Sequence, residues 1–230
     1  MRDEPVAALV LAAGRGERLG SELPKAFVPV GGVTMLGRSI ERLLCVEQIG
    51  RVQPVVPHDA PELTGVAADP RIAGPVVGGA ERQESVAAGL AALPREVRWV
   101  VVHDAARCLV EPADVRRVIE AAAETGAAIL ARPASDTIKL VSDGAVTRTL
   151  DRAACWAAQT PQVFRRDLLA EAHDKAQADG FLGSDDAQLV ERLGVEIRVA
   201  LGGERNLKIT WPADLALAEQ WLRSAGEGVT

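Results

Sequence analysis

The chain has 230 residues, and 26 Lys and Arg against 32 Asp and Glu give it a formal net charge of −6. Hydrophobic residues make up 48% and charged residues 25%, which is typical of a globular protein and excludes a disordered chain. The acidic balance argues against a general nucleic-acid-binding protein, while a local basic pocket remains compatible with it.

Neither a membrane protein nor a disulfide-stabilised secreted protein is predicted. No apolar run approaches the roughly 20 residues that a membrane-spanning helix needs. The segment MRDEPVAALV begins with charged residues and does not resemble a secretory signal. Cys45, Cys108 and Cys155 are far apart and form no CxxC pair, so we expect a reducing, cytoplasmic location without a zinc site.

Apolar runs alternate with helical patterns along the whole chain. Each run is nearly continuous in Val, Leu, Ile and Ala, as in parallel strands covered on both faces. This alternation predicts a three-layer α/β fold with a mostly parallel sheet, in one domain spanning residues 1–230. The expected strands are Val6–Ala12, Val52–Pro57, Ile72–Val77, Trp99–His103, Ala127–Ala131 and Val195–Leu201. The expected helices are Thr34–Leu44, Glu81–Leu93, Pro112–Thr125, Asp167–Ala178, Ser184–Leu193 and Pro212–Ser224.

One segment interrupts the alternation. Between Asp136 and Arg152, two short alternating stretches flank Ser142–Asp143–Gly144, and Asp-Gly between such stretches is a strong hairpin signal. An isolated hairpin is marginally stable in water and needs a packing partner. Two interpretations stay open: an edge hairpin on the parent sheet, or an arm that packs against a second subunit.

The glycine-rich turn after the first strand is the most informative stretch. Gly14, Gly16 and Gly20 are spaced G-x-G-x-x-x-G, because Leu19 occupies the position of the third glycine in a dinucleotide-binding turn. A Walker A loop is also excluded, since Lys25 follows a proline and precedes an alanine. Glycines at the carboxyl end of a strand let successive N–H groups approach one anion.

Three cations, Arg15, Arg18 and Lys25, accompany this turn. Together with the backbone amides they suit a polyphosphate, whose charge must be neutralised and held in one geometry. The competing interpretation is a tight strand–helix turn with solvated basic side chains.

Asp104 directly follows the expected strand Trp99–His103, at the same edge of the sheet. One carboxylate combined with phosphate oxygens and water is the usual environment of Mg²⁺. The alternative is that Asp104 caps the turn or pairs with Arg107. We expect His103 to orient the strand end rather than to act as a base.

Several motifs, taken together, resemble the cytidylyltransferases of the non-mevalonate isoprenoid pathway. The matching stretches are LAAGRGERLG…LPKAF, GGAERQESV, HDAAR, the DT of SDTIK, AQTPQ and NLKIT, in the family's order from about Ala7 to Glu219. The opening motif marks only the wider nucleotidyltransferase superfamily, whereas HDAAR with Gly-Gly-x-x-Arg-x-x-Ser and TPQ is narrower. The resemblance implies a Rossmann-like nucleotidyltransferase fold with a protruding β-arm.

The resemblance also implies an activity: transfer of CMP from CTP to 2-C-methyl-D-erythritol 4-phosphate, with release of pyrophosphate, in a Mg²⁺-dependent homodimer. The implied catalytic residues are Arg18, Lys25 and Lys208. The implied nucleotide-binding residues are Ala12, Ala13, Gly14, Gly16, Gly79, Ser85, Asp104 and Ala105, with Asp104 also at the metal. The implied acceptor-binding residues are Arg107 and Thr160, with Thr137 and Arg152 supplied by the neighbouring subunit.

Three residues depart from the family's pattern. Ala80 stands where the family often has Asp, which removes a hydrogen bond on the nucleotide side. Cys108 replaces a proline and Arg205 an aspartate, and we expect both to change only loop packing.

The implied chemistry agrees with this inventory of side chains. A phosphomonoester is already anionic near neutral pH, because its second pKa is about 6, so its oxygen needs no general base. Cations, a metal ion and positioning of the two phosphates are what in-line transfer at phosphorus requires. The alternatives are a cytidylyltransferase for another polyol phosphate such as ribitol 5-phosphate, a catalytically silent nucleotide-binding module, and a dehydrogenase, which the glycine spacing disfavours.

Overall fold

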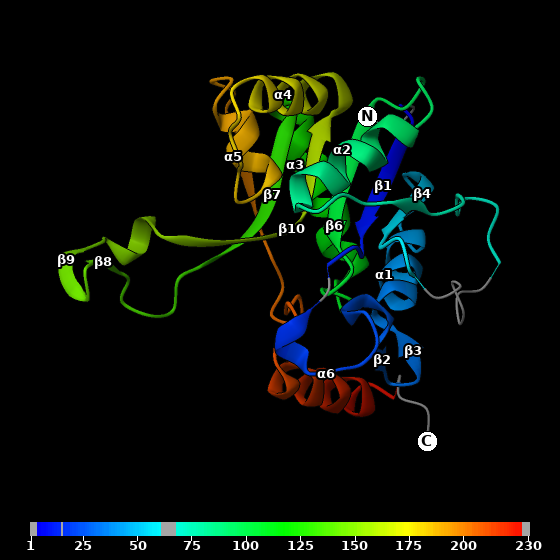
Figure 1. Ribbon diagram of the computed structural model, residues 1–230, viewed down its shortest axis with the longest axis horizontal. Helices are drawn as coiled ribbons and strands as arrows, with labels where there is room; N and C mark the ends of the chain where they lie inside the picture. The colour runs from blue at the N-terminus through cyan, green and yellow to red at the C-terminus, as the bar shows by residue number, and fades with distance from the viewer. Residues whose placement is uncertain (1–3, 15, 61–67, 227–230) are drawn as a thin grey trace.

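The computed structural model describes residues 4–14, 16–60 and 68–226, and its centre is a seven-stranded sheet in the order β11-β7-β10-β6-β1-β4-β5 (Figure 1). Every strand of this sheet except β10 runs in the same direction. Its strands are β1 (Val6–Leu11), β4 (Ile49–Val56), β5 (Val76–Val77), β6 (Trp99–Asp104), β7 (Ala127–Pro133), β10 (Trp156–Arg165) and β11 (Arg198–Leu201). The helices are α1 (Met35–Leu44), α2 (Arg82–Ala92), α3 (Pro112–Thr125), α4 (Arg166–Ala178), α5 (Asp186–Glu191) and α6 (Pro212–Ser224). The predicted α/β fold with a mostly parallel sheet is confirmed, and the single-domain organisation stays a prediction.

Apolar side chains on both faces of the sheet produce the three layers. Along β1, Val6, Ala8 and Val10 pack with the helices α1 and α3, whereas Ala7 and Leu9 pack with α2, α4 and α5. Because successive side chains of a strand point to opposite faces, a strand covered on both sides must be apolar throughout. This is the physical reason for the unbroken apolar runs in the sequence.

The antiparallel strand β10 was not predicted. It contains Pro161, which cannot donate to a ladder and argues against a central strand. Its pairing with β7 shifts between Ala158, opposite Ala131, and Gln162, opposite Ile129. Three residues of β10 therefore oppose one residue of β7, and the proline lies in this bulge, where no ladder bond is required of it.

Three further predictions of element length need correction. The expected strand Ile72–Val77 reduces to a bridge between Val52 and Ile72 followed by β5, since Gly74 and Pro75 interrupt it. The last strand begins only at Arg198. The helix expected over Ser184–Leu193 is the shorter α5, whose N-cap Asp185 accepts a hydrogen bond from the Gln188 amide at 2.9 Å. A short hairpin, β2 (Pro29–Val30) with β3 (Val33–Thr34), was also not predicted.

The hairpin β8 (Lys139–Ser142) and β9 (Ala145–Thr149) forms a separate two-stranded sheet and projects from the body (Figure 1). Its turn residues Asp143 and Gly144 both have positive φ, 51° and 76°, as a two-residue hairpin turn requires. The prediction of a hairpin is confirmed. Its interpretation as an edge of the parent sheet is wrong, because neither strand pairs with that sheet.

Helix α6 covers the edge of the sheet where the parallel strands end. It contributes Ala218 and Leu222 to a third apolar cluster with Leu19, Met35 and Ile209. This cluster ties the segments after β1, β6 and β11 to one another at the carboxyl ends of the strands, where α/β proteins place their ligands. None of the helices in the described part of the chain has the length and apolar character needed to cross a bilayer.

The N-cap of α1 provides a test of local stability. The Thr34 Oγ1 accepts a hydrogen bond from the Gly37 amide at 3.0 Å. We expect Thr34→Ala to lower the free energy of unfolding by about 1 kcal/mol, because an amide at the helix start loses its acceptor. Urea titration measures the change, with Thr34→Ser as the matched control that keeps the hydroxyl. An alanine variant as stable as the serine variant would contradict the cap's role.

Candidate active site

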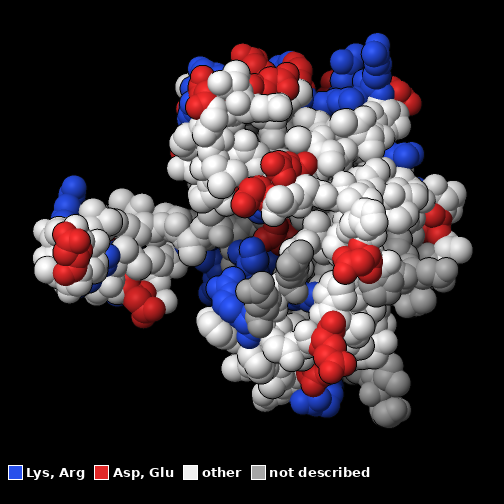
Figure 2. All heavy atoms as spheres, viewed as in Figure 1, with Lys and Arg blue, Asp and Glu red and all other residues white. Residues whose placement is uncertain are grey.

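A pocket of about 270 Å³ opens where β1 and β6 end. Its wall joins the glycine-rich turn, the N-terminal turn of α2, the end of β6 and the segment before α6. Figure 2 shows basic side chains gathered around a hollow below the middle of this face. The structure brings ten of the sequence-predicted site residues to the pocket: Ala12, Ala13, Gly14, Gly16, Arg18, Lys25, Gly79, Ser85, Asp104 and Lys208.

Gly16 is essential to the shape of the turn. Its φ is 70°, in the region that favours glycine, and a Cβ built on it would overlap the side chain of Lys25. The missing side chain therefore lets Lys25, the first residue of a short 3-10 helix (Lys25–Phe27), lie against the turn. Arg15, the third predicted cation of the turn, lies outside the described residues.

Four cations line the pocket, Arg18, Lys25, Arg82 and Lys208. Arg18 lies over the ring of Trp211 at 5.6 Å, which restrains its otherwise exposed guanidinium. Lys208 comes from the segment before α6. Burial and repulsion from Lys208 lower the pKa of Lys25 to about 8. Such a low lysine pKa reflects positive charge concentrated in a partly dry site, which a polyanion would neutralise.

Asp104 ends β6 and lies between two of the pocket's cations. Its Oδ2 is 2.7 Å from the Lys208 Nζ, and its Oδ1 is 3.4 Å from the Arg82 Nε. Burial alone would raise the pKa of Asp104, but Arg82 and Lys208 outweigh it and hold that pKa well below its ordinary value. The carboxylate is therefore ionised and orients both cations.

A chain of hydrogen bonds fixes the Asp104 backbone from behind. The Asp104 amide donates to the Thr160 Oγ1 at 3.0 Å, and that hydroxyl lies 3.2 Å from the His103 Nδ1. The His103 Nε2 faces the Arg107 carbonyl at 3.3 Å and must donate, since a carbonyl only accepts. Burial lowers the pKa of His103 to about 4, so the ring is neutral and its Nδ1 accepts from Thr160. His103 thus orients the strand end, as expected.

Arg107 does not reach this pocket wall. Its Nη1 donates to the Asn206 carbonyl at 2.8 Å. The Asn206 amide nitrogen in turn donates to the Thr160 carbonyl at 2.9 Å and to the Gln159 Oε1 at 3.0 Å. Asn206, which is 1% exposed, therefore anchors the segment that carries Lys208 to β10. Its part in the site was not predicted, because its partners lie 46 and 47 residues away in sequence.

Backbone and short side chains form the wall at the start of α2. The Gly79 amide donates to the Ser85 Oγ at 3.2 Å, and that hydroxyl donates to the Glu81 carbonyl at 3.1 Å. A Cβ at Gly79 would overlap the Cβ of Glu84, which cannot move away as a side-chain tip could, so only glycine fits. The Ala80 amide donates to that same Glu84 oxygen at 2.8 Å, so its N–H is already occupied.

The remaining predicted site residues lie off the pocket wall. Ala105 needs correction: it is fully buried in the core, its amide donates to the Leu11 carbonyl, and the next residue, Ala106, lines the pocket. Thr137 and Arg152 are exposed near the base of the arm, and the Arg152 Nη1 donates to the Ser135 carbonyl at 3.2 Å. Within one chain these two residues do not join the pocket.

Arg82 is the main residue that sequence reasoning missed. It begins α2, lines the pocket and contacts Asp104. Arg82 is the arginine of the Gly-Gly-x-x-Arg-x-x-Ser element, so the sequence contained a signal for it. Its role could not be assigned without knowing its partners.

Few metal ligands line this pocket, and its acidic residues are Asp104 and Glu81. Across the described ranges no three His, Cys, Asp or Glu residues come together as a metal site. Asp104 ends β6 beside the pocket's cations, and its Oδ1 contact of 3.4 Å leaves room for another partner. This donor set fits Mg²⁺ held mainly by phosphate oxygens and water, and it does not fit a metal held by protein alone.

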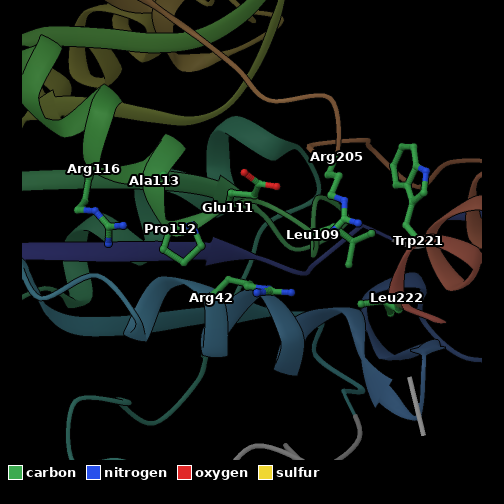
Figure 3. A pocket seen from close by; sticks show the side chains of 9 residues that line it. All are labelled: Arg42, Leu109, Glu111, Pro112, Ala113, Arg116, Arg205, Trp221 and Leu222. Carbon is green, nitrogen blue, oxygen red and sulfur yellow. The ribbon is translucent and has the colours of Figure 1, made fainter. Parts of the chain in front are cut away.

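A second pocket, of about 320 Å³, lies between α1, the start of α3 and α6 (Figure 3). Arg42, Arg116 and Arg205 line it together with Glu111 and Trp221. None of the residues predicted for the active site belongs to this wall. The departure at Arg205 thus faces a separate cavity, away from Asp104 and Lys25.

Comparison with known proteins agrees with this geometry. The sequence model of the 2-C-methyl-D-erythritol 4-phosphate cytidylyltransferase family matches residues 6–224. The chain is 46% identical over 223 residues to the enzyme of that name from Nocardia farcinica, covering 96% of this chain and 95% of the relative. It is 45% identical over 218 residues to that from Symbiobacterium thermophilum, covering 94% and 92%.

Solved structures give the same result. The crystal structure of 2-C-methyl-D-erythritol 4-phosphate cytidylyltransferase from Thermus thermophilus superimposes with a TM-score of 0.80 at 39% identity, covering 95% of this chain and 99% of that one. The 4-diphosphocytidyl-2C-methyl-D-erythritol synthase from Anaerococcus prevotii superimposes with a TM-score of 0.84 at 28% identity, covering 96% and 99%. Sequence, fold and pocket agree, and the chain belongs to the 2-C-methyl-D-erythritol 4-phosphate cytidylyltransferase family.

Proposed function

We propose that this chain transfers CMP from CTP to 2-C-methyl-D-erythritol 4-phosphate, giving 4-diphosphocytidyl-2-C-methyl-D-erythritol and pyrophosphate. The observation that carries the proposal is the convergence of Arg18, Lys25 and Lys208 with Asp104 at the carboxyl end of the sheet. Burial and repulsion from Lys208 lower the pKa of Lys25, and a triphosphate in this pocket would offset both by pairing with the cations. The family to which the chain belongs supplies the identity of both substrates.

The reaction needs positioning and charge rather than a protein nucleophile. An oxygen of the acceptor phosphate attacks the α-phosphorus of CTP, and a new P–O bond forms. The bond from that phosphorus to the bridging oxygen breaks, and pyrophosphate leaves with the electron pair. Arg18 and Lys25 would hold the triphosphate, and Lys208 would stabilise charge that develops at the α-phosphate.

The walls of the pocket would orient the two substrates. Ala12, Ala13, Gly14, Gly79 and Ser85 offer small side chains and backbone groups for the cytosine and ribose. Arg107, held by Asn206 beside the Lys208 segment, would approach the acceptor phosphate. Thr160 would act indirectly, by fixing the Asp104 backbone through its hydroxyl.

We propose Mg²⁺ as the cofactor, with Asp104 as its protein ligand. When bound, Mg²⁺ would neutralise phosphate charge and bring CTP to one geometry. The ionised Asp104 carboxylate supports this assignment, because its Oδ1 contact with Arg82 is long. Lys208 on Oδ2 would keep the carboxylate in place.

We also propose a homodimer in which the arm of one subunit completes the acceptor pocket of the other. The arm exposes Leu140, Val141 and Val146 at 46%, 59% and 61%, which favours burial against another surface. Thr137 and Arg152, near its base, would then reach the partner's acceptor. A cytoplasmic location is proposed too, consistent with three free cysteines.

Substitution of the pocket lysines tests the role of their charges and the identity of the two substrates together. We expect Lys25→Ala and Lys208→Ala each to lower kcat/KM by about 100-fold or more, because each removes a preorganised charge-stabilising group. Pyrophosphate release from CTP and 2-C-methyl-D-erythritol 4-phosphate measures the loss. Lys175→Ala, in α4 and away from the pocket, is the control and keeps wild-type turnover.

Several outcomes would count against the proposed function. Full activity in both lysine variants would make the basic pocket merely structural. Faster turnover with ribitol 5-phosphate would show that the acceptor is another polyol phosphate, while the proposed CMP transfer from CTP would still hold. No pyrophosphate release with any sugar phosphate would favour a silent nucleotide-binding module.

A further prediction concerns the pH dependence of kcat/KM. Lys25 is charged below its pKa of about 8 and loses its proton as pH rises through that value. We therefore expect kcat/KM for CTP, which reports the free enzyme, to fall above about pH 8. Lys25→Arg keeps its charge at any working pH and moves the decline to higher pH. An unchanged alkaline limb in the arginine variant would assign the decline to another group.

Substitutions in the arm test its proposed role in the dimer. Val141 and Val146 pair across the hairpin and are exposed, so we expect Val146→Asp to weaken the dimer by placing a charge on the buried interface. Sedimentation velocity measures the dimer fraction, and Ser142→Asp at the turn is the matched control. We expect Arg152→Ala to raise the KM for the acceptor. A mixed dimer of one wild-type and one Arg152→Ala subunit should retain one intact acceptor pocket. A monomer with full activity would overturn the cross-subunit assignment.

A further inference from the structure

Arg82 connects the pocket to a buried group of charges behind it. Its Nε is 3.4 Å from the Asp104 Oδ1, inside the pocket. Its Nη1 donates to the Asp186 Oδ2 at 2.7 Å, on the side away from the pocket. Because a guanidinium is planar, these two contacts together define its orientation. Its remaining nitrogen, Nη2, is buried without a partner in the part of the chain that the structure describes.

Asp186 has no contact with the pocket and none with solvent. It begins α5, its side chain is 0% exposed, and it does not line the pocket. Its other oxygen, Oδ1, lies 3.0 Å from the Nε2 of His173 in α4. His173 is itself 6% exposed. The row His173–Asp186–Arg82–Asp104 therefore runs from the helical layer to the reacting end of the sheet.

A buried charge is not needed for α4 and α5 to pack. Leu169 and Ala172 of α4 join Ala187, Leu189 and Val190 of α5 in one apolar cluster. A carboxylate removed from water is stable only when it is paired and hydrogen-bonded, so an apolar residue would serve packing equally well. Burial would raise the pKa of Asp186, but Arg82 and His173 outweigh it and keep the pKa below its ordinary value.

The geometry explains what this charge does for Arg82. An arginine with one carboxylate partner tends to form two parallel bonds to it. If Asp186 were neutral, Asp104 would be the remaining anion beside Arg82, and the guanidinium would turn toward it. Arg82 would then compete with Lys208 for Asp104 oxygens. The bond to Asp186 restricts Arg82 to the long contact of 3.4 Å and leaves Asp104 to Lys208.

We propose that Asp186, held by His173, is a positioning residue for the nucleotidyl transfer: it orients Arg82 and so keeps Asp104 available to Lys208 and to the bound nucleotide. The inference rests on the proposed function of the pocket. It assigns Asp186 no contact with substrate, and all of its influence passes through Arg82.

A double-mutant cycle tests this dependence. Asp186→Asn keeps the shape and removes the charge, and we expect it to lower kcat about 10-fold to 100-fold, the range typical of residues that orient the ligands of a metal. The KM for CTP should change little, because Asp186 touches no ligand. In an Arg82→Gln background, Asp186→Asn should change kcat by less than about twofold, since its route to the site is already removed.

Neighbouring residues provide the controls. Asp185→Asn makes the same chemical change one residue away, at the α5 N-cap, where the carboxylate contacts the Gln162 Nε2 and the Gln188 amide but not Arg82. It should lower the melting temperature without lowering kcat per folded molecule. If Asp186→Asn does not fold, His173→Gln loosens Asp186 while keeping its charge, and a smaller loss of kcat is expected that also vanishes in the Arg82→Gln background.

The outcomes separate the inference from the proposed function. Unchanged kcat in Asp186→Asn, or an equal loss with and without Arg82, would overturn the positioning role. Loss of stability alone, with normal kcat per folded molecule, would reduce Asp186 to a structural residue. A wild-type chain that releases no pyrophosphate from CTP with any acceptor would overturn the proposed function, and the inference with it.

Discussion

The ion pair between Asp104 and Lys208 is the interaction on which the site depends. Several cations must lie close together to bind a polyphosphate, and in a partly buried pocket they repel one another strongly. The carboxylate at the end of β6, 2.7 Å from the Lys208 Nζ, lets them coexist before any ligand arrives. Its own position is set by the Thr160 hydroxyl and the neutral His103 behind it. Partial burial costs each charge its hydration, and it also strengthens the attraction between Asp104 and Lys208, which solvent would weaken.

The fold supplies this arrangement by bringing together ends of elements rather than a continuous motif. The turn after β1 gives Gly16, whose missing side chain makes room for Lys25. The segment before α6 gives Lys208, and the same segment gives Trp211, whose ring restrains Arg18. The apolar cluster of α6 with Leu19 and Ile209 holds these segments together. Packing around α6 is therefore part of the site's construction, although α6 lies outside the sheet.

The family membership and the geometry support each other without being the same argument. Family membership rests on a match over residues 6–224 and on relatives of 45% and 46% identity. The geometry independently limits the chemistry: the pocket combines four cations with the ionised Asp104 carboxylate, which suits transfer between phosphates. The departure at Ala80 changes little at the backbone, because its amide donates to Glu84. Arg205 lies in a separate cavity with Arg42 and Arg116 (Figure 3).

Local patterns in the sequence were enough to predict most strands and helices, the arm's turn at Asp143–Gly144, and the placement of Arg18, Lys25 and Asp104 at one edge of the sheet. Such features depend on periodicity, on turn chemistry and on the rule that parallel strands end at one edge. The role of Lys208 was expected only from the family resemblance. The tertiary structure alone decided that β10 runs antiparallel through the centre despite Pro161, and that Ala106 rather than Ala105 faces the pocket. It alone decided the pairing of Arg82 with Asp186 across 104 residues. A side chain's partners at such separation depend on strand order and layer packing, which no local pattern encodes.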